Sequence, residues 1–463
     1  MTEDRLTPIV ENIAKATLFL VPLLAVLLFL QPSWPVVLFL IVILALAPVV
    51  VMNDELTLFL ILIIRPVVDV FGEQHLVEIG SIPFNFSSVL SILIIIWAAF
   101  RLLAYQKPIW KKPLFWPWIG VLLVMLPSFL WTESLTASVR EYVRLLSIAV
   151  LFFVAFDILS TKKSIRRFFS TLAISVIIPA SVGIIQLLRS GGLEESVLKN
   201  RVFGTFGHPN VFAFYLVLVL SLLVVSLPFL QKLWRPRIIT ALVVLFSLFV
   251  MTYTRGAWIG MTIVLILFGA FFFRKKLIAA LMGAAALFLL LPLVSGPVYS
   301  VFNIDLLRLP VISRAFDWKS EDSSLDWRVK LWSEMRRKVV ERPEFGHGLG
   351  TFPILRERQV ENYFEGTEAH NDYLRLMIET GIVGVAAYGI LILSLVGSGI
   401  RAVFRSRENE RRRYAVIFLG LTLAYAFMSY FDNLLQGTAV MWAWWASFAA
   451  LMMLTKKTNP ADT

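Results

Sequence analysis

Long apolar stretches alternate with short polar connections over nearly the whole chain, beginning at Ala16. Most are about 17 to 22 residues long, close to the roughly 20 residues with which an α-helix crosses ~30 Å of hydrocarbon. Backbone groups in lipid must be hydrogen-bonded within their own segment, so we expect each stretch to be a membrane-spanning helix. The pattern predicts spans at approximately 16–30, 35–52, 56–71, 86–105, 114–131, 143–159, 168–188, 210–230, 238–254, 256–273, 277–296, 376–398, 414–430 and 438–455.

The segment 56–71 is the least regular of these predicted spans. It is short, and it carries Arg65, Pro66 and Asp69. Proline interrupts a helix, and charged side chains at membrane depth turn toward protein or water instead of lipid. We therefore expect this segment to be broken or re-entrant, with its polar groups facing other helices.

The composition supports the same class of protein. The 463 residues are 58% hydrophobic and only 16% charged, and the mean hydropathy is +0.79. A water-soluble domain does not need so apolar a chain. The fold class predicted from the sequence is therefore all-α, in a polytopic membrane protein.

The net charge of +12 comes largely from short basic clusters between the apolar stretches. Such clusters mark the cytoplasmic side of a membrane, and each is separated from the next by two predicted spans. All of them then lie on one side, and both termini are cytoplasmic. Membrane orientation accounts for this charge, so we do not expect nucleic acid as a partner. The clusters lie at 107–112, 162–167, 232–237, 274–276, 401–413 and 456–457.

One long polar connection falls on the opposite, extracytoplasmic side. It runs over residues 296–375 and contains both acids and bases. Segments of this length cross the membrane largely regardless of their charge. We predict N-terminal transmembrane helices in 1–295, an extracytoplasmic loop domain with short helices in 296–375, and C-terminal transmembrane helices in 376–463.

Within this loop, residues 323–343 have the pattern of an amphipathic helix. A capping box at Ser323 begins it and Pro343 ends it. Arg328 lies at the centre of the apolar stripe, whose other members are Leu325, Leu331, Trp332, Met335 and Val339, with Lys330, Arg337 and Glu341 opposite. Either the stem of Arg328 packs on this stripe while its guanidinium meets a local carboxylate, or the guanidinium faces a lipid phosphate at the membrane boundary.

Three more polar residues are predicted on the same side. Arg255 stands between two spans and is followed by Gly256, while Arg201 and His208 lie in the polar segment 200–210. An ordinary interfacial anchor is the simpler interpretation of Arg255. Positive anchors are less usual outside, however, so a role in binding an anion is the alternative.

The sequence EAHNDYLRLMIETG, residues 368–381, places His370 and Asn371 just before an apolar run. We expect a helix to begin at Thr367 or Glu368, with His370 in its first turn. A helix N-terminus disfavours imidazolium and favours anions, so a neutral His370 is a candidate general base. The alternative is a histidine that only caps the helix.

Four segments, in this order, resemble the O-antigen ligase and polysaccharide polymerase superfamily. They are TRGAWIG (254–260), DWRVKLW (326–332), GHGLGTF (346–352) and AHNDYLRLMIETGIVG (369–384). NRVFGTFGHPN (200–210) is similar to a looser element of that family. The resemblance covers roughly 200–384. Members of the family usually have about twelve spans, so the expected number is about 12–14.

This resemblance implies a glycosyltransferase of the bacterial cytoplasmic (inner) membrane, with its active site on the extracytoplasmic side. The donor would be a glycan linked to undecaprenyl diphosphate, and the acceptor a hydroxyl of another glycan or of a lipid core. By similarity, Arg255 and Arg328 would hold the diphosphate and His370 would deprotonate or orient the acceptor. Substrate-binding roles would also fall to Arg201, Asn371 and Tyr373.

No metal or cofactor is expected for this chemistry. The chain has no cysteine, and it contains no DxD pair, HExxH motif or Cys/His cluster with the spacing of metal ligands. GHGLGTF is rich in glycine but lacks a Walker lysine, so we interpret it as a tight turn and assign no role to His347.

A polysaccharide or lipid transporter or flippase is the alternative function. Transporters place ionisable groups near the middle of the membrane, whereas here, apart from Arg65 and Asp69, the predicted spans are nearly free of charge at that depth, and the candidate residues gather at the outer boundary. Within the family, the sequence leaves open whether the acceptor makes the protein a ligase, a polymerase or an enzyme that modifies protein.

Overall fold

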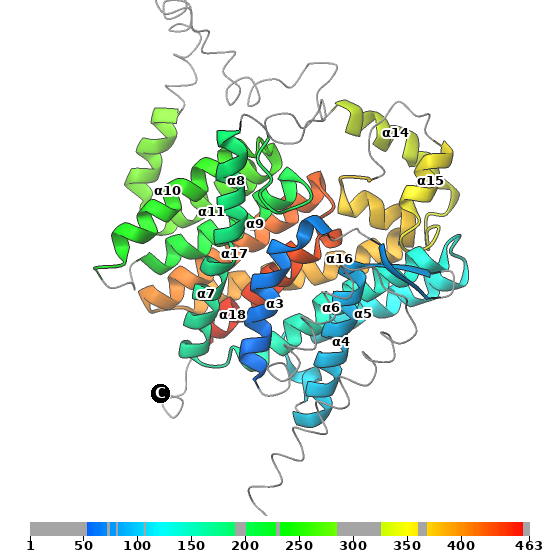
Figure 1. The fold of residues 1–463 in the computed structure, drawn as a ribbon, viewed down its shortest axis with the longest axis horizontal. Helices are drawn as coiled ribbons and strands as arrows, with labels where there is room; N and C mark the ends of the chain where they lie inside the picture. Colours follow the sequence, from blue (N-terminus) through cyan, green and yellow to red (C-terminus); the bar gives the residue numbers. More distant parts are fainter. Residues whose placement is uncertain are drawn as a thin grey trace, which may run out of the picture.

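The computed structural model describes residues 53–71, 75–79, 82–105, 108–189, 201–227, 232–284, 326–359 and 368–456. This part of the chain is almost entirely helical, with one short antiparallel hairpin (Figure 1). The hairpin joins β1 (His75–Ile79) to β2 (Ile82–Asn85), with Val77 opposite Phe84. The helices are α3 (Asp54–Val67), α4 (Phe86–Tyr105), α5 (Phe115–Met125), α6 (Leu135–Ile158), α7 (Lys162–Ser175), α8 (Ile177–Leu188), α9 (Pro209–Ser226), α10 (Arg235–Met251), α11 (Arg255–Phe272), α14 (Asp326–Glu341), α15 (Phe352–Gln359), α16 (Asp372–Arg405), α17 (Asn409–Phe431) and α18 (Thr438–Thr455).

Six segments of the described chain are long and apolar enough to cross a membrane. This confirms the all-α, polytopic class. Predicted spans 16–30 and 35–52 lie outside the described residues, and 277–296 does so in part, so the total of 12–14 stays a prediction. The six are Lys162–Leu188 (α7 and α8), Pro209–Ser226, Arg255–Phe272, Asp372–Arg405, Asn409–Phe431 and Thr438–Thr455.

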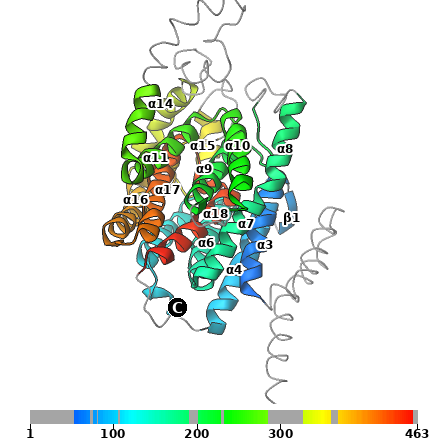
Figure 2. The same ribbon diagram turned by 90° about the vertical axis from the view of Figure 1, so that its left-hand side faces the viewer.

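Helices α9 and α18 form the centre of the bundle, and their apolar residues face protein on all sides (Figure 2). A helix that is hydrophobic all round is typically one that other helices surround. Three tryptophans of α18, Trp442, Trp444 and Trp445, fill this centre, and the N–H groups of the first two are hydrogen-bonded. Trp442 Nε1 donates to Ser147 Oγ at 3.1 Å, and Trp444 Nε1 donates to the Phe214 carbonyl at 3.3 Å.

The irregular segment 56–71 behaves as its sequence predicts. Helix α3 is only 14 residues long and is followed by the 3₁₀ turn η1 (Asp69–Phe71). Arg65 is buried, pairs with Asp69 at 2.8 Å and donates to Ser87 Oγ at 2.8 Å and Thr438 Oγ1 at 3.0 Å. Its charge therefore faces neighbouring elements of the protein.

Helix α14 confirms the amphipathic pattern predicted in the long loop. Leu331 and Met335 are fully buried in a small core shared with α15 and α16, whereas Lys330 and Arg337 are exposed. The helix ends at Glu341, before Pro343. The predicted cap at Ser323 and the apolar Leu325 lie outside the described residues, and the domain division at 296 and 375 stays a prediction.

The GHGLGTF segment fits against a kink in α16. Gly381 interrupts that helix with φ 65° and ψ −167°, and a Cβ there would lie 2.2 Å from the Glu344 backbone. Across the kink, the His347 amide donates to the Ile378 carbonyl at 2.9 Å and the Gly348 amide to the Glu379 carbonyl at 2.8 Å. The tight turn is therefore present, and it fixes the first turns of α16 against α14.

Candidate active site

Five stretches that are distant in sequence meet at one end of the bundle. The beginning of α14 contacts the end of α17, because Arg328 Nη1 donates to the Phe431 carbonyl at 2.8 Å. The segment before α16 contacts residues that follow α17, and the segment 201–210 and the start of α11 join from the other side. In Figure 1, α14 and α15 lie near this end, beside the beginning of α16.

His370 and Asp432 form the central pair of this cluster. Nδ1 of His370 lies 3.0 Å from Oδ1 of Asp432, and both side chains are mostly buried. The indole of Trp327 meets the imidazole edge-to-face, with ring centroids 5.3 Å apart. A carboxylate on one side and an aromatic ring on the other restrict the orientation of this histidine.

The prediction that His370 lies in the first turn of a helix was wrong. Helix α16 begins at Asp372, and Asn371 is its N-cap, with its side chain accepting from the Leu374 amide at 3.0 Å. His370 precedes the cap and has φ +46°, in the left-handed region that few residues other than glycine adopt. The helix starts later than predicted because Asn371 takes the N-cap position, for which asparagine is among the most favoured residues.

The partner of His370 is an ionised carboxylate. Burial acts to raise the pKa of Asp432, but the positive charges of His370 and Arg328 outweigh it and hold this pKa below its ordinary value. An ionised carboxylate can only accept hydrogen bonds, so Nδ1 of the imidazole carries the hydrogen between them. Nε2 is then the atom that can take a proton. His370 is therefore oriented by the carboxylate of Asp432, whereas the sequence predicts that the helix N-terminus sets its environment.

A chain of hydrogen bonds connects this pair to Arg201. Asn210 Nδ2 donates to Oδ2 of Asp432 at 2.5 Å, and Arg201 Nη2 donates to Oδ1 of Asn210 at 2.7 Å. The guanidinium also donates to the Thr252 carbonyl at 2.8 Å and to Thr254 Oγ1 at 3.0 Å. Arg201 is buried by these contacts. The structure therefore gives it a supporting position next to the pair, and its predicted contact with substrate stays a prediction.

His208 lies beside the same pair, with its ring centroid 6.5 Å from that of His370. Its Nδ1 accepts a hydrogen bond from the backbone N–H of Asn210 at 3.1 Å, which makes His208 the N-cap of α9. Burial lowers the pKa of His208 to about 3, an effect that Asp432 opposes and Arg201 reinforces. This histidine is therefore neutral near pH 7 and carries its hydrogen on Nε2.

Arg328 contacts Phe431, and the start of α11, where Arg255 lies, passes close to the same residue. The guanidinium of Arg328 bonds to the Phe431 carbonyl and lies 5.6 Å from the Trp327 ring centroid. Arg255 is the first residue of α11, and a Cβ at the following Gly256 would lie 3.5 Å from the Phe431 Cβ. The two arginines come from helices that are far apart in the sequence and start at the same end of the bundle.

Asn371 and Tyr373 make contacts that hold α16 in place. The backbone N–H of Asn371 donates to Asn433 Oδ1 at 3.0 Å, in addition to the capping bond that its side chain accepts. Tyr373 donates from its hydroxyl to the Ala426 carbonyl of α17 at 2.8 Å. These bonds attach the start of α16 to α17 and to the segment that follows it. The roles of Asn371 and Tyr373 in substrate binding stay predictions.

Sequence reasoning missed Asp432, Asn433 and Asn210. A signal was present, since Asp432 and Asn433 form a polar pair between the apolar runs 414–430 and 438–455, on the side predicted for His370. Among the residues that the structure describes, no group of three or more His, Cys, Asp or Glu side chains could hold a metal ion.

Residues 240–389 match the family described as O-Antigen ligase. The resemblance is thereby confirmed for this part of the chain, which includes Arg255, Arg328 and His370. A relative described as an uncharacterized protein of Haemophilus influenzae is 28% identical over 149 residues. That alignment covers 30% of this chain and 37% of the relative. The family match favours a membrane glycosyltransferase of the O-antigen ligase or polymerase type.

Proposed function

We propose that this protein is a multi-pass enzyme of the bacterial cytoplasmic membrane that transfers a glycan from undecaprenyl diphosphate to an acceptor hydroxyl. The reaction would take place on the extracytoplasmic side, with both termini in the cytoplasm. The observation that carries the proposal is the His370–Asp432 pair, which lies beside Arg328 within an O-antigen ligase-like chain. The acceptor would belong to a second glycan or to a lipid core.

His370 would act as the general base. Its Nε2 takes the proton of the acceptor hydroxyl as that oxygen forms a bond to the anomeric carbon of the donor sugar. The bond between the anomeric carbon and the diphosphate oxygen breaks, and undecaprenyl diphosphate leaves with the electron pair. Asp432, through its bond to Nδ1, keeps Nε2 directed toward the acceptor and stabilises the imidazolium that forms.

Arg328 and Arg255 would hold the diphosphate. Negative charge grows on the departing oxygen during transfer, and a guanidinium can stabilise it through two parallel N–H donors. The Phe431 carbonyl and the Trp327 ring orient the guanidinium of Arg328, so little reorganisation is needed. In this proposal Arg201 and Asn210 act indirectly, because they position Asp432.

The test is transfer by the purified full-length protein in detergent, with an undecaprenyl-diphosphate-linked glycan and a set of glycan and lipid-core acceptors. Glycan transfer without a sealed membrane is the expected result. If no transfer occurs and the protein in proteoliposomes moves the lipid-linked glycan between leaflets, the transporter alternative is correct. Comparison of the acceptors used separates ligase from polymerase.

A further inference from the structure

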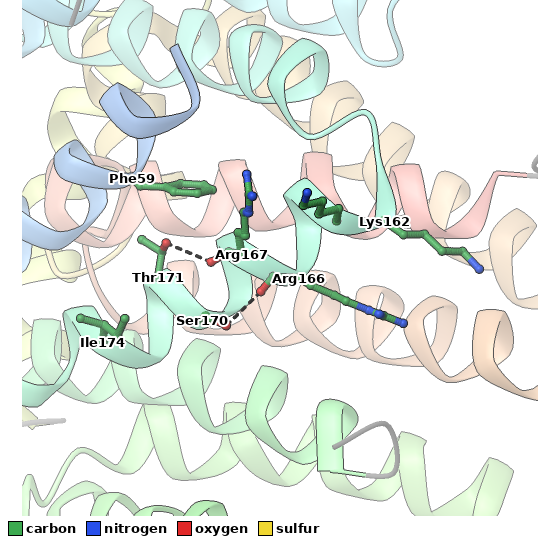
Figure 3. Close-up of a pocket in the computed structure, with 8 residues that line it drawn as sticks. Phe59, Lys162, Arg166, Arg167, Ser170, Thr171 and Ile174 are labelled. Carbon is green, nitrogen blue, oxygen red and sulfur yellow. Dashed lines mark hydrogen bonds between the residues drawn. The ribbon is translucent and has the colours of Figure 1, made fainter. Parts of the chain in front are cut away.

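A cavity of about 650 Å³ lies against α7 and α3 (Figure 3). Lys162, Lys163, Arg166 and Arg167 of α7 line one part of it, and Phe59 of α3 lines another. This basic cavity is separate from the candidate active site. The two regions lie at opposite ends of α3. The end of that helix leads to Val70, which bonds to Thr205 at 3.0 Å, whereas its first turn carries Glu55, which pairs with Arg167 at 3.2 Å.

The positive charge of the basic cavity is poorly compensated by the protein. Within the described part of the chain, Arg167 is the one cation of these four that forms an ion pair. The first turn of α7 contains no acid, and its N-terminal amides carry their own partial positive charge. Cations gathered at a helix N-terminus are repelled by the positive end of the helix dipole. An anion in the cavity would therefore be stabilised both by the basic side chains and by the dipole.

The wall of the cavity changes from charged to apolar within about two helical turns of Arg167. Ile174 lines the cavity, and it is followed along the chain by Ile177 and Ile178; all three are at least half exposed. The segment from Lys162 to Leu188 is long and apolar enough to cross a membrane. These exposed isoleucines therefore face lipid, and the cavity stands where a lipid head group would meet its acyl chains.

The hydroxyl groups in the cavity are engaged by their own helix. Ser170 donates to the Arg166 carbonyl at 3.1 Å and Thr171 donates to the Arg167 carbonyl at 3.0 Å (Figure 3). The side-chain donors that remain for a ligand are cationic, and they select for negative charge over the detailed shape of a head group.

We propose that this cavity binds the head group of an anionic phospholipid. The phosphate lies against Lys163 and Arg166, and an acyl chain follows the exposed face from Ile174 to Ile178. The ligand is a lipid of the surrounding bilayer and takes no part in the transfer reaction, so the proposal does not depend on the identity of the glycan donor.

Native mass spectrometry of the full-length protein, titrated in detergent with phosphatidylglycerol or phosphatidylcholine, tests the proposal. The wild type should retain at least one more phosphatidylglycerol than phosphatidylcholine. The double variant Lys163→Gln/Arg166→Gln should retain that lipid roughly tenfold more weakly, because two surface cations are lost. Arg274→Gln/Lys275→Gln is the matched control: both residues are exposed beyond the end of α11, and this variant should bind as the wild type does.

The thermal stability of both double variants in lipid-free detergent separates binding from folding, because the substituted side chains are exposed and should leave it unchanged. Equal retention of phosphatidylglycerol by the wild type and the Lys163/Arg166 variant would overturn the proposal. So would displacement of the lipid by inorganic phosphate at an equal concentration, since the cavity would then recognise free phosphate. Equal retention of the two lipids by the wild type would exclude recognition of charge.

Discussion

Nδ1 of His370 lies 3.0 Å from Oδ1 of Asp432, although the two residues are 62 positions apart in the chain. The aspartate directly follows α17 and the histidine precedes the N-cap of α16, so the packing of two helices creates the pair. Asp432 itself is held from the other side by Asn210. A histidine that precedes a helix cap thereby acquires a fixed orientation.

Replacement of Asp432 by Asn should lower transfer by roughly 10²- to 10⁴-fold while the protein still folds. An amide can donate to Nδ1, and this stabilises the tautomer in which Nε2 carries the hydrogen and cannot act as a base. The measurement is the rate of glycan transfer at matched expression. Glu357→Gln, an exposed acid of α15, is the control and should be silent. Unchanged transfer by Asp432→Asn would remove the carboxylate from the mechanism.

His370→Ala should abolish transfer and leave folding and donor-lipid binding largely intact, because Asp432 loses one partner but keeps its bond to Asn210. His347→Ala should show the reverse pattern. That histidine is buried, and its Nε2 lies 2.9 Å from the Lys338 carbonyl, so the variant should lose stability and keep activity per folded molecule. A fully active His370→Ala protein would reduce this residue to a structural one.

Arg328→Lys should lower transfer by roughly ten- to over a hundredfold, or about 1.5–3 kcal/mol of transition-state stabilisation. Lysine keeps the charge but has no planar pair of donors for the diphosphate. Arg337→Lys, at an exposed position of the same helix, is the control. Transfer from purified undecaprenyl-diphosphate glycan is compared at matched thermal stability. If the two variants were equally active, Arg255 would be the remaining candidate for holding the diphosphate.

The stability of the protein should depend on the ionisation of Asp432. Its pKa is lowered in the folded state, so its contribution to stability is present above the ordinary pKa of about 3.9 and is lost as the pH falls toward the lower folded value. The melting temperatures of wild type and Asp432→Asn in detergent should therefore differ most above pH ~4 and converge in more acidic solution. A constant difference down to the folded value would show that the charge of Asp432 does not stabilise the fold.

The orientation in the membrane can be tested directly, since the chain has no native cysteine. Glu357→Cys in α15 should react with a membrane-impermeant thiol reagent on intact spheroplasts, whereas Asn409→Cys should not. Asn409 begins α17, whose 23 residues place it ~34 Å along the helix from the residues beside His370. Labelling of Asn409→Cys alone would invert the proposed topology and place the candidate site in the cytoplasm.

Much of the fold follows from short-range pattern. Apolar runs of membrane length predicted the helices from α9 to α11 and from α16 to α18, because lipid leaves the backbone almost no alternative to a helix. The amphipathic period of residues 323–343 likewise placed Leu331 and Met335 inside and Arg337 outside. These are local properties, in which each residue is set by neighbours three or four positions away.

The first residue of α16 shows where local pattern is insufficient. Thr367 and Glu368 were acceptable caps by composition, but Asn371 occupies the cap and His370 adopts a left-handed backbone next to Asp432. The contacts of Asn371 and His370 with the segment after α17 compete with the local preference, and the sequence near the helix start does not contain them.

The sequence by itself therefore determined the class of protein, most helix positions and the residues that resemble an O-antigen ligase. Tertiary structure alone decided that Asp432 orients His370, that Arg201 supports Asp432 through Asn210, and that the GHGLGTF segment fixes the kink at Gly381. The physical reason is range. Hydropathy and helix periodicity act within one segment, whereas a hydrogen bond between two helix ends exists only after packing has brought those ends within about 3 Å.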